Sequence, residues 1–334
     1  MPRVSVLLPL YNHAGHCHRA IRSILDQSWR DLELVVVDDG STDDGVAVAE
    51  TAVGGDGRVR IMGKAHGGIV SALNHALGGV DCEFVARMDA DDFSHPRRLQ
   101  LQLAKLSSDP RLGAVDCTVS LATSPVTGDG MHRHIAWLNS LVTAQAIQRA
   151  LFVESPLVHP AVLMKRAALE KAGGYLDAPG PEDYSLWLRM VAAGFRLGKL
   201  DQCLFEWTDL PQRLTRTHPD YAPRALFQLK ASMLPRLHPR CAEGVQIWGA
   251  GQAGRRLRKA LSQQQIPVRR FFDIDPRKVG RTLGEAPVLP LEDLVEHRDL
   301  LTLVAIGVSS AKQLVRQWAS KHGWEEGEDL VLCA

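Results

Sequence analysis

The stretch that most constrains the fold is "DLELVVVDDGSTDD", residues 31–44, a continuous apolar run that ends in acids and a glycine. Such a run is typical of a strand in a parallel sheet whose two faces are both covered. Residues 14–28 before it and 44–52 after it have helical periodicity. Further strands are predicted in "RVSVLLPLYN", "VRIMG" and "CEFVARMDADD". Strand and helix therefore alternate, which predicts a doubly wound α/β sheet for the first part of the chain.

The pattern weakens and then restarts further along the chain. Helices are expected at 96–107 and 140–151, with a less regular region between them, and in "PEDYSLWLRMVAAGF". A helix ending near Leu237 is followed by the turn-rich segment "LHPRCAEG". After it, "VQIWGAGQAGRRLRKAL" begins a new series of strand, glycine-rich turn and helix. We therefore predict a first domain over residues 1–240 and a smaller α/β domain over residues 241–334.

Charge and composition limit the classes of partner. The formal net charge is +1, and without a clustered Lys/Arg stretch no nucleic-acid binding is expected. No apolar run is long enough to cross a bilayer, and the N-terminus lacks a signal-peptide pattern. Six scattered cysteines without C-x-x-C spacing fit reduced thiols. We expect a cytoplasmic protein, and leave open peripheral association with the inner face of the membrane and oligomerisation.

Three acids, Asp89, Asp91 and Asp92, follow the strand predicted in "CEFVAR". Carboxylates this close repel one another, and burying an unpaired one is costly. Ligands of doubly wound sheets bind beyond the carboxyl ends of the strands, where this cluster falls. One interpretation is a set of oxygen ligands for Mg²⁺ or Mn²⁺ shared with substrate phosphates. The other is a group of acids that stabilises the first turn of a helix.

Several motifs in order favour the first interpretation. Residues 3 to about 220 resemble the family 2 glycosyltransferases of the GT-A fold, through "VSVLLPLYN", "SILDQSWRDLELVVVDDGSTD", "GGIVSALNHAL", "FVARMDADD" followed by "HPRRL", "HPAVLMKR", "GGY" and "EDYSLWLRM". The resemblance implies transfer of a sugar, with inversion, from a nucleotide diphosphate donor to a glycan or glycoconjugate hydroxyl. It also implies that Asp89-Ala90-Asp91 is the D-x-D motif. Asp91 would be the direct metal ligand, Asp89 would contact the donor ribose or a metal-bound water, and Asp92 would only start a helix.

The same resemblance implies a site for the nucleotide base. Asp39, with Asp38 beside it, matches the acids that hold the base, and a carboxylate that accepts the imide N–H of uracil would favour UDP-sugars. Pro9 and Tyr11 match positions that line the base pocket, where Tyr11 could stack on the ring. Either acid could instead satisfy local backbone N–H groups. Tyr11 could equally be a core residue.

An inverting displacement also needs a base that deprotonates the acceptor hydroxyl. "PEDYSLWLRM" matches the family's E-D motif, which implies Asp183 as the base and Glu182 as its supporting neighbour. Acids in the first turn of a helix also stabilise it by roughly 0.3–1 kcal/mol without any catalytic role. His159 matches a position near the acceptor pocket. The basic residue that often covers the diphosphate has no single counterpart, and the candidates are Arg213, Arg216 and His218.

The second domain carries a separate motif. Gly249, Gly251 and Gly254, with Asp273 about 20 residues further on, fit the G-x-G-x-x-G dinucleotide fingerprint. The domain resembles Rossmann-like domains, including the small domain of sugar acyltransferases that holds a nucleotide sugar. It either binds a nucleotide or serves as a stabilising or oligomerising appendage. Two alternatives to sugar transfer therefore stay open: a catalytically idle nucleotide-sugar-binding or assembly protein, and an NAD-dependent oxidoreductase, which the absence of a Tyr-x-x-x-Lys pair disfavours.

Overall fold

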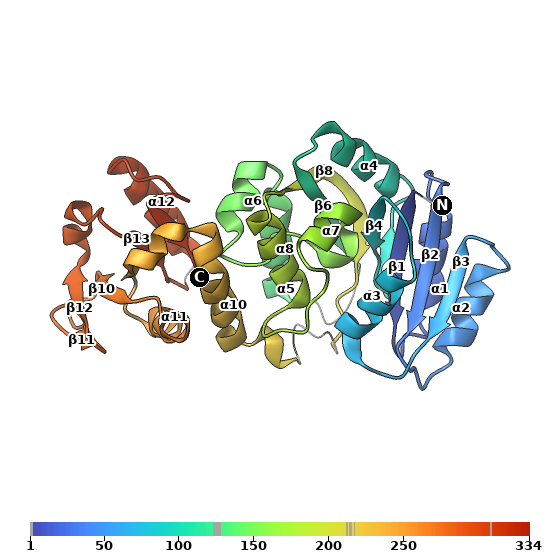
Figure 1. The fold of residues 1–334 in the computed structure, drawn as a ribbon, viewed down its shortest axis with the longest axis horizontal. Helices are drawn as coiled ribbons and strands as arrows, with labels where there is room; N and C mark the ends of the chain where they lie inside the picture. Colours follow the sequence, from blue (N-terminus) through green and yellow to red (C-terminus); the bar gives the residue numbers. More distant parts are fainter. Residues whose placement is uncertain (1–2, 123–127, 212, 214–215, 217, 308) are drawn as a thin grey trace. The chain divides into compact units, whose positions relative to one another are not determined.

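The computed structural model describes residues 3–122, 128–211, 213, 216, 218–307 and 309–334 (Figure 1). The chain forms two compact units. The first comprises Met1–Ile147, Pro156–Ala178 and Arg189–Arg216, and the second comprises Gln148–Ser155, Pro179–Leu188 and Thr217–Ala334. Along the sequence, the predicted boundary at residue 240 lies after the last strand of the first sheet and before the first strand of the second sheet. The second compact unit also includes α10 (Pro223–Leu237), which precedes that boundary.

The first unit is built on an eight-stranded mixed sheet with the order β3-β2-β1-β4-β7-β6-β8-β5. Its parallel half consists of β1 (Val4–Leu10), β2 (Leu32–Asp38), β3 (Val59–Gly63) and β4 (Phe84–Arg87). The other half consists of β5 (Phe93–Ser94), β6 (Leu112–Leu121), β7 (Leu163–Lys165) and β8 (Arg196–Trp207). There β7 runs antiparallel to β4 and β6, and β8 runs parallel to β6. This confirms the predicted doubly wound, mixed α/β sheet.

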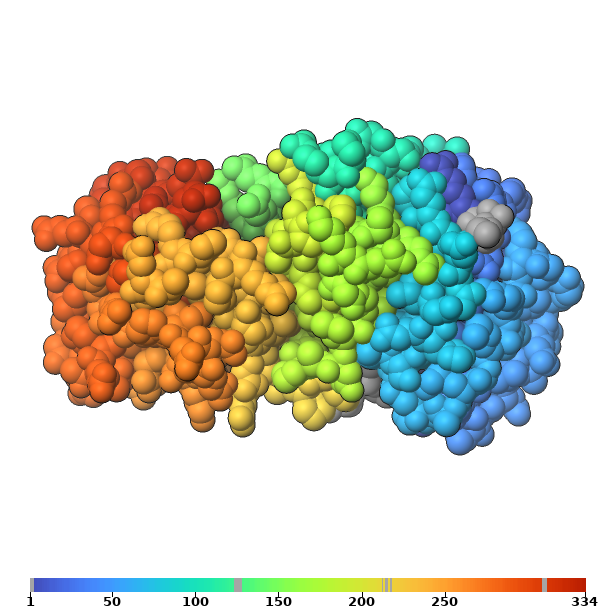
Figure 2. Space-filling model, in the orientation of Figure 1, coloured from blue at the N-terminus to red at the C-terminus, as the bar shows by residue number. Residues whose placement is uncertain are grey.

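Helices cover both faces of the parallel half. The helices of this unit include α1 (Cys17–Leu25), α2 (Gly45–Val53), α3 (Gly68–Gly78), α4 (Arg98–Ser108), α5 (Asp129–Ser140) and α7 (Arg166–Lys171). Of these, α4, α5 and α7 pack against strands of the other half, β6, β7 or β8. Because side chains alternate along a strand, Val6 and Leu8 pack in one core with Ile21 and Ile24 of α1. Leu7 is buried as well, and α3 packs against β1 and β2. Figure 2 shows the same view with all atoms drawn, and the N-terminal strands and helices of this unit are blue there.

Residues 112–121, which we expected to be irregular, form the long strand β6. We expected a less regular region here, but Asp116 within this strand is fully buried and lies 2.9 Å from the ammonium of Lys199 on β8. Asp116 also accepts the N–H of Val158 at 2.9 Å. A buried charge is tolerated when it is paired and hydrogen-bonded, and the partner here is distant in sequence. The helix predicted over 140–151 is also wrong in its bounds, because α5 ends at Ser140 and α6 spans Ala144–Ala150.

The second unit contains a six-stranded sheet with the order β11-β12-β10-β9-β13-β14. Its strands are β9 (Val245–Trp248), β10 (Val268–Asp273), β11 (Thr282–Leu283), β12 (Ala286–Pro290), β13 (Leu301–Val304) and β14 (Leu330–Leu332). All pairings except β11 with β12 are parallel. Chain order therefore reverses at β9, as in a doubly wound sheet. Trp248, Phe272 and Leu294 form part of its core.

Further helices are found among the described residues of the two units. They are α8 (Glu182–Ala192), α11 (Gln252–Gln263), α12 (Ser309–Lys321), and the short 3₁₀ helices η1 (His159–Ala161), η2 (Pro219–Tyr221), η3 (Pro239–Glu243) and η4 (Leu291–Glu296). In the described parts of the chain, no helix has both the length and the apolar character that a bilayer crossing requires.

Candidate active site

The parallel strands bring three groups of predicted site residues, at the ends of β1, β2 and β4, to one edge of the first sheet. β1 pairs with β2 on one side and with β4 on the other, so the carboxyl ends of these strands meet at that edge. Pro9 and Tyr11 lie at the end of β1, and Asp38 ends β2. The N–H of Asp39 donates to the carbonyl of Leu10 at 2.8 Å, which joins the two strand ends. The acid cluster follows the end of β4.

Asp89, Asp91 and Asp92 each offer one carboxylate oxygen, and these three oxygens lie within 4.8 Å of one another. Thr208, which follows β8, holds their turn in place. Its N–H donates to Asp92 Oδ1 at 2.8 Å, and its hydroxyl donates to the carbonyl of Asp91 at 2.6 Å. Asp92 is buried, and its Oδ2 has no hydrogen-bond partner among the described residues. This concentration of hard oxygen donors, one of them buried without a partner, fits Mg²⁺ or Mn²⁺.

Asp92 does not start a helix, contrary to our expectation. β5 follows it directly, and the next helix, α4, begins only at Arg98. The structure instead fits the first interpretation of the sequence, in which all three acids lie together. The structure therefore assembles three carboxylates where the D-x-D motif indicated two.

The three carboxyls differ in their electrostatic environment. Burial alone would raise the pKa of Asp89, but the charges of Arg87 and His159 outweigh burial, so its pKa is lowered. Burial, together with the charge of Asp89, raises the pKa of Asp91. Burial and the charges of the other two acids raise the pKa of Asp92 well above its ordinary value. Like charges thus oppose full ionisation of the cluster, and a bound cation would relieve that repulsion.

Two buried arginines that the sequence analysis missed support this cluster. Arg87 on β4 pairs with Asp89 and donates to the carbonyls of Leu7 and Met88, at 3.1 and 2.9 Å. Arg98, at the start of α4, donates to the carbonyls of Arg87 and Pro160. Burial lowers the pKa of Arg98 to about 10. The signal in the sequence was a charged residue within an apolar strand, which requires buried partners.

A cavity of about 340 Å³ opens beside Asp91. It is lined by Gly15, His16, His18, Arg19, Asp91, Ala122 and Thr208. The "HAGHCH" segment therefore borders the acid cluster, but within the described residues only the three aspartates form a group with metal-ligand spacing. Burial also raises the pKa of Cys17, which disfavours a thiolate ligand there. Asp91 is thus reachable from an open space with basic side chains on its wall.

Asp39 is buried, and both of its carboxylate oxygens accept hydrogen bonds. Lys64 Nζ lies 2.6 Å from Oδ1, and the N–H groups of Gly67 and Gly68 lie 3.0 Å from Oδ1 and 2.8 Å from Oδ2. Burial raises the pKa of Asp39, but these donors lower it more, and its pKa falls below the ordinary value. Asp39 thus caps the start of α3. Its direct contact with a base stays a prediction, while Asp38 accepts the N–H of Ser41 at 3.0 Å.

Tyr11 is not a core residue, because 42% of it is exposed. Its ring stacks on that of His66, with 4.2 Å between the centroids and 25° between the planes. His66 Nδ1 lies 3.0 Å from the carbonyl oxygen of Asp39, which places this ring beside the strand ends. The sequence analysis missed His66, although it stands directly before the glycines that open α3. The pair offers an exposed aromatic face at this edge of the sheet.

Asp183 and Glu182 occupy the first turn of α8, in the second compact unit. Asp183 Oδ1 accepts the N–H of Tyr184 at 2.7 Å, and the hydroxyl of Ser155 lies 3.3 Å from Oδ2. The Tyr184 hydroxyl donates to the carbonyl of Leu151 at 2.7 Å. These contacts orient the half-buried carboxylate of Asp183. They are also the contacts that a purely structural acid at a helix start would make.

The predicted basic residues have different surroundings. Arg213 lies 3.5 Å from Asp209 and 4.1 Å from the ring of Trp207, and its charge lowers the pKa of all three acids of the cluster. Arg216 pairs with Asp209 at 2.8 Å, and His218, in the second unit, lies 3.3 Å from Asp220.

His159 is buried in the first unit. Its Nε2 lies 3.0 Å from the hydroxyl of Tyr175. In its protonated form, His159 would lower the pKa of Asp89. His159 therefore lies within electrostatic range of the cluster.

The glycine-rich turn of the second unit is tightly packed. A side chain at Gly249, whose φ is +115°, would approach the carbonyl oxygen of Ala305 to 2.8 Å, and one at Gly254 would approach that of Gly249 to 1.9 Å. Asp273 accepts the N–H of Ala250 at 2.8 Å and pairs with Lys278 at 3.0 Å. Gly251 caps α11. Asp273 therefore holds the turn itself, and a nucleotide bound there stays a prediction.

Comparison with known proteins identifies the family. Residues 5–173 match the model of Glycosyl transferase family 2. The chain belongs to this family. EpsE of Bacillus subtilis (strain 168), which is named as a putative glycosyltransferase, is 29% identical over 211 residues, or 61% of this chain and 72% of EpsE. The chondroitin synthase of Pasteurella multocida (strain Pm70) is 37% identical over 118 residues, or 35% of this chain but only 12% of the synthase.

Solved structures agree on the fold. TarS 1–349 of S. aureus, in complex with UDP-GlcNAc, superposes on this chain with a TM-score of 0.55 at 18% sequence identity. The match covers 79% of this chain and 82% of the TarS chain. The mannosyltransferase PcManGT from Pyrobaculum calidifontis, in complex with GDP-Man and Mn²⁺, superposes with a TM-score of 0.52 at 18% sequence identity. That match covers 98% of this chain and 82% of the PcManGT chain. These structures support the GT-A fold, while the match to the family model confirms the resemblance to family 2 and with it a transferase.

Proposed function

We propose that this family 2 member is a metal-dependent, inverting glycosyltransferase that moves a sugar from a nucleotide diphosphate donor to a glycan or glycoconjugate hydroxyl. UDP-sugars are the favoured donors. The observation that carries the proposal is the convergence of Asp89, Asp91 and Asp92 within 4.8 Å, beside an open cavity at the strand-end edge. The complexes of TarS with UDP-GlcNAc and of PcManGT with GDP-Man and Mn²⁺ support it.

The acids would hold Mn²⁺ or Mg²⁺, with Asp91 and Asp89 as the proposed ligands and Asp92 as a third oxygen donor. A cation bound there would stabilise the negative charge that grows on the leaving diphosphate. Among the three basic candidates we assign Arg213 to the diphosphate, because its charge acts on all three carboxyls.

The strand ends of β1 and β2 would hold the nucleotide. The exposed ring of Tyr11, supported from behind by His66, offers a stacking surface for the base. Pro9 and Asp38 lie at the same edge. We assign Asp39 to this site mainly through the turn that it holds, because its oxygens already accept Lys64 and two backbone N–H groups.

Asp183 is the proposed general base, and Glu182 its supporting neighbour. The N–H of Tyr184 and the hydroxyl of Ser155 orient the carboxylate of Asp183, whose proposed role is to take the proton of the acceptor hydroxyl. His159, buried against Tyr175, is assigned to the acceptor side.

Calorimetric titration of UDP-, GDP- and dTDP-sugars, with and without Mn²⁺, tests the proposal. We expect binding that needs both nucleotide and metal, and that weakens about tenfold or more in Asp91→Asn, or roughly 1.4 kcal/mol per tenfold change. The matched control is Asp81→Asn, because Asp81 is an exposed acid just before β4, at the other end of the strand. Binding of equal strength without metal would contradict metal dependence. Binding without any turnover would indicate an idle donor-binding protein instead.

A further inference from the structure

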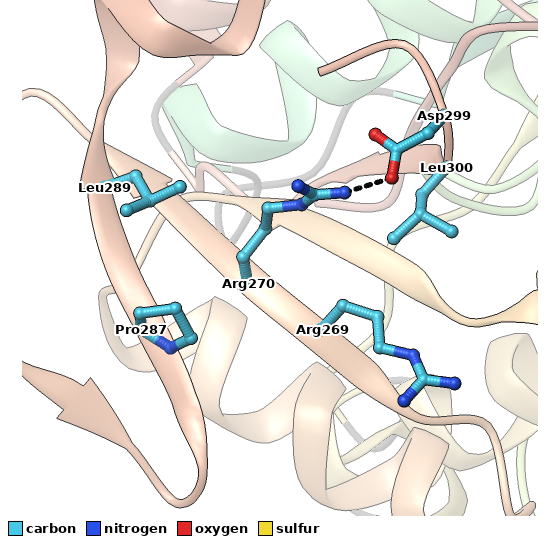
Figure 3. Close-up of a pocket in the computed structure, with 6 residues that line it drawn as sticks. All are labelled: Arg269, Arg270, Pro287, Leu289, Asp299 and Leu300. Carbon is cyan, nitrogen blue, oxygen red and sulfur yellow. Dashed lines mark hydrogen bonds and ion pairs between the residues drawn. The ribbon is translucent and has the colours of Figure 1, made fainter.

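The two arginines that line a cavity of about 380 Å³ in the second unit are directed to different partners (Figure 3). Arg270 forms an ion pair with Asp299, and its Nη1 lies 2.8 Å from His297 Nδ1. Arg269 instead lies 3.4 Å from the carbonyl of Glu243. The lining therefore does not offer two guanidinium groups to one anion. A stronger link between this unit and the proposed chemistry lies at α10.

Lys230 of α10 is buried and holds a segment that lies 77 residues earlier in the chain. Its Nζ donates to the carbonyls of Val153 and Cys333, each at 2.8 Å. Val153 also packs against the apolar core of the second sheet, which includes Trp248. An ammonium that gives two of its three N–H groups to carbonyls fixes both of the segments that carry them. Residues 151–155 are thus anchored to the second unit's sheet.

The same segment orients the first turn of α8. At one end of it, the hydroxyl of Ser155 lies 3.3 Å from Asp183 Oδ2. At the other end, the carbonyl of Leu151 accepts the hydroxyl of the fully buried Tyr184 at 2.7 Å. The N–H of Tyr184 in turn donates to Asp183 Oδ1 at 2.7 Å. The segment therefore contacts α8 at the proposed base and at the residue next to it.

A second contact ties α10 directly to the chain that leads into α8. A side chain at Gly180 would approach the side chain of Leu229 to 3.0 Å, so the chain just before α8 packs closely on α10. Leu229 and Lys230 are neighbours on α10, and they contact the two segments that meet at Asp183. All of these residues belong to the second compact unit.

We propose that Lys230 is a positioning residue for sugar transfer, which fixes residues 151–155 and through them the carboxylate of Asp183. This role rests on the proposed function, in which Asp183 takes the proton of the acceptor hydroxyl. A base must lie within hydrogen-bond reach of that proton, and a displacement of about 1 Å can lower a rate about 100-fold. The second unit's sheet then supports the base, and this role needs no ligand at the glycine-rich turn.

Hydrogen–deuterium exchange of the full-length protein tests the structural part of this role without any substrate. In Lys230→Met, amide exchange in residues 151–155 and 182–186 should accelerate about tenfold more than in β9, because the segment loses its anchor while the sheet keeps its core. Lys259→Met is the matched control, since it removes an exposed lysine of α11 in the same unit. Equal acceleration in all three stretches would show a general loss of stability and overturn the proposal.

Turnover tests the catalytic part. With Mn²⁺ and whichever UDP-, GDP- or dTDP-sugar binds best, water can replace the acceptor: it attacks the anomeric carbon, gives its proton to the base, and nucleotide diphosphate leaves. Lys230→Met should lower the maximal rate per donor-binding site about tenfold. The donor KM should stay unchanged, because the proposed donor residues belong to the first unit. Tyr184→Phe removes only the hydroxyl bonded to Leu151, should give the same result, and replaces Lys230→Met if that variant does not fold.

The outcomes separate this role from the proposed function. An Asp183→Asn protein that releases nucleotide diphosphate as fast as the wild type would refute the base itself, and the role of Lys230 with it. A slow Asp183→Asn protein beside a Lys230→Met protein of wild-type rate would refute only the positioning role. A maximal rate and a donor affinity that fall together in Lys230→Met would also refute that role, because the lysine would then support the whole protein rather than the base.

Discussion

Lys64 Nζ lies 2.6 Å from Asp39 Oδ1, and this pair joins the end of β2 to the turn that opens α3. Only 4% of the Asp39 side chain and 16% of that of Lys64 are exposed, so water screens the pair weakly. The same carboxylate accepts the N–H groups of Gly67 and Gly68. This turn carries His66, the ring on which Tyr11 stacks. Its conformation therefore depends on one ionised acid, Asp39.

Replacing the lysine should weaken this turn. In Lys64→Met the carboxylate of Asp39 loses its charged donor, and we expect the free energy of unfolding to fall by about 1–3 kcal/mol. Donor affinity should fall as well, because His66 is held less firmly. Urea denaturation and donor titration measure the two effects, and Lys105→Met, at an exposed site on α4, is the control. Unchanged stability would show that the two N–H groups suffice for Asp39.

The stacking surface can be tested by removing one ring. Tyr11→Ala should raise the donor dissociation constant several-fold, since an aromatic pair contributes about 0.5–1.5 kcal/mol. Tyr11→Phe keeps the ring and should bind donor nearly as well as the wild type. Both are measured by titration with a UDP-sugar in Mn²⁺. If the two variants lose affinity equally, the hydroxyl rather than the stacked face of Tyr11 contacts the donor.

The proposed base predicts a separation of binding from turnover. Asp183→Asn should lower the transfer rate by about 10²–10⁴-fold, because the amide cannot take a proton. Its donor affinity should stay close to the wild-type value. Asp177→Asn, an exposed acid five residues before α8, controls for the loss of charge. Equal loss of rate and affinity in Asp183→Asn would identify a structural acid.

Disrupting the buried ion pair between Asp116 of β6 and Lys199 of β8 should strongly lower the free energy of unfolding. Asp116 and Lys199 have no exposed side-chain surface. Lys199→Met leaves a buried carboxylate without its counter-charge and should destabilise the protein by about 3–5 kcal/mol. In the double variant with Asp116→Asn part of that loss should return, which urea denaturation can detect. A double variant no more stable than Lys199→Met would rule out the unpaired charge as the cause.

The buried ammonium of Lys230, in the second unit, should make the free energy of unfolding depend on pH. Its Nζ donates to the carbonyls of Val153 and Cys333, each at 2.8 Å, and burial lowers its pKa from 10.5 to about 8. Between these two values the unfolded chain binds more protons than the folded one, so this group's contribution to stability rises with pH.

The variant Lys230→Met isolates that effect. Buried thiols act in the opposite direction above pH 9, because burial raises the pKa of Cys333 to about 12. They are common to both proteins, so the difference in unfolding free energy reports Lys230. As the pH rises from 8 to 10.5, that difference should shift in favour of the wild type by a few kcal/mol. A constant difference over this range would show that Lys230 keeps an ordinary pKa when folded.

Local patterns in the sequence were enough to predict the parallel half of the first sheet and the group of acids, Asp89, Asp91 and Asp92, at the end of one of its strands. Continuous apolar runs such as Leu34–Val37 need burial on both faces, wherever they are placed in the chain. Acids at the strand ends then meet at one edge, because parallel neighbours end on the same side. Neither inference needs a partner from a distant segment.

Only the tertiary structure decided how the buried polar groups are satisfied. Asp116 belongs to a strand because Lys199 pairs with it, and Asp92 joins the cluster in a turn that Thr208 holds. Asp39 is occupied by the turn before α3. A charge inside the protein is stable only beside its hydrogen-bond partners, and here the partners lie 25 to 116 residues away in the chain. Composition and periodicity describe each segment separately, so they predict which elements carry the polar residues. Folding determines which groups those residues contact.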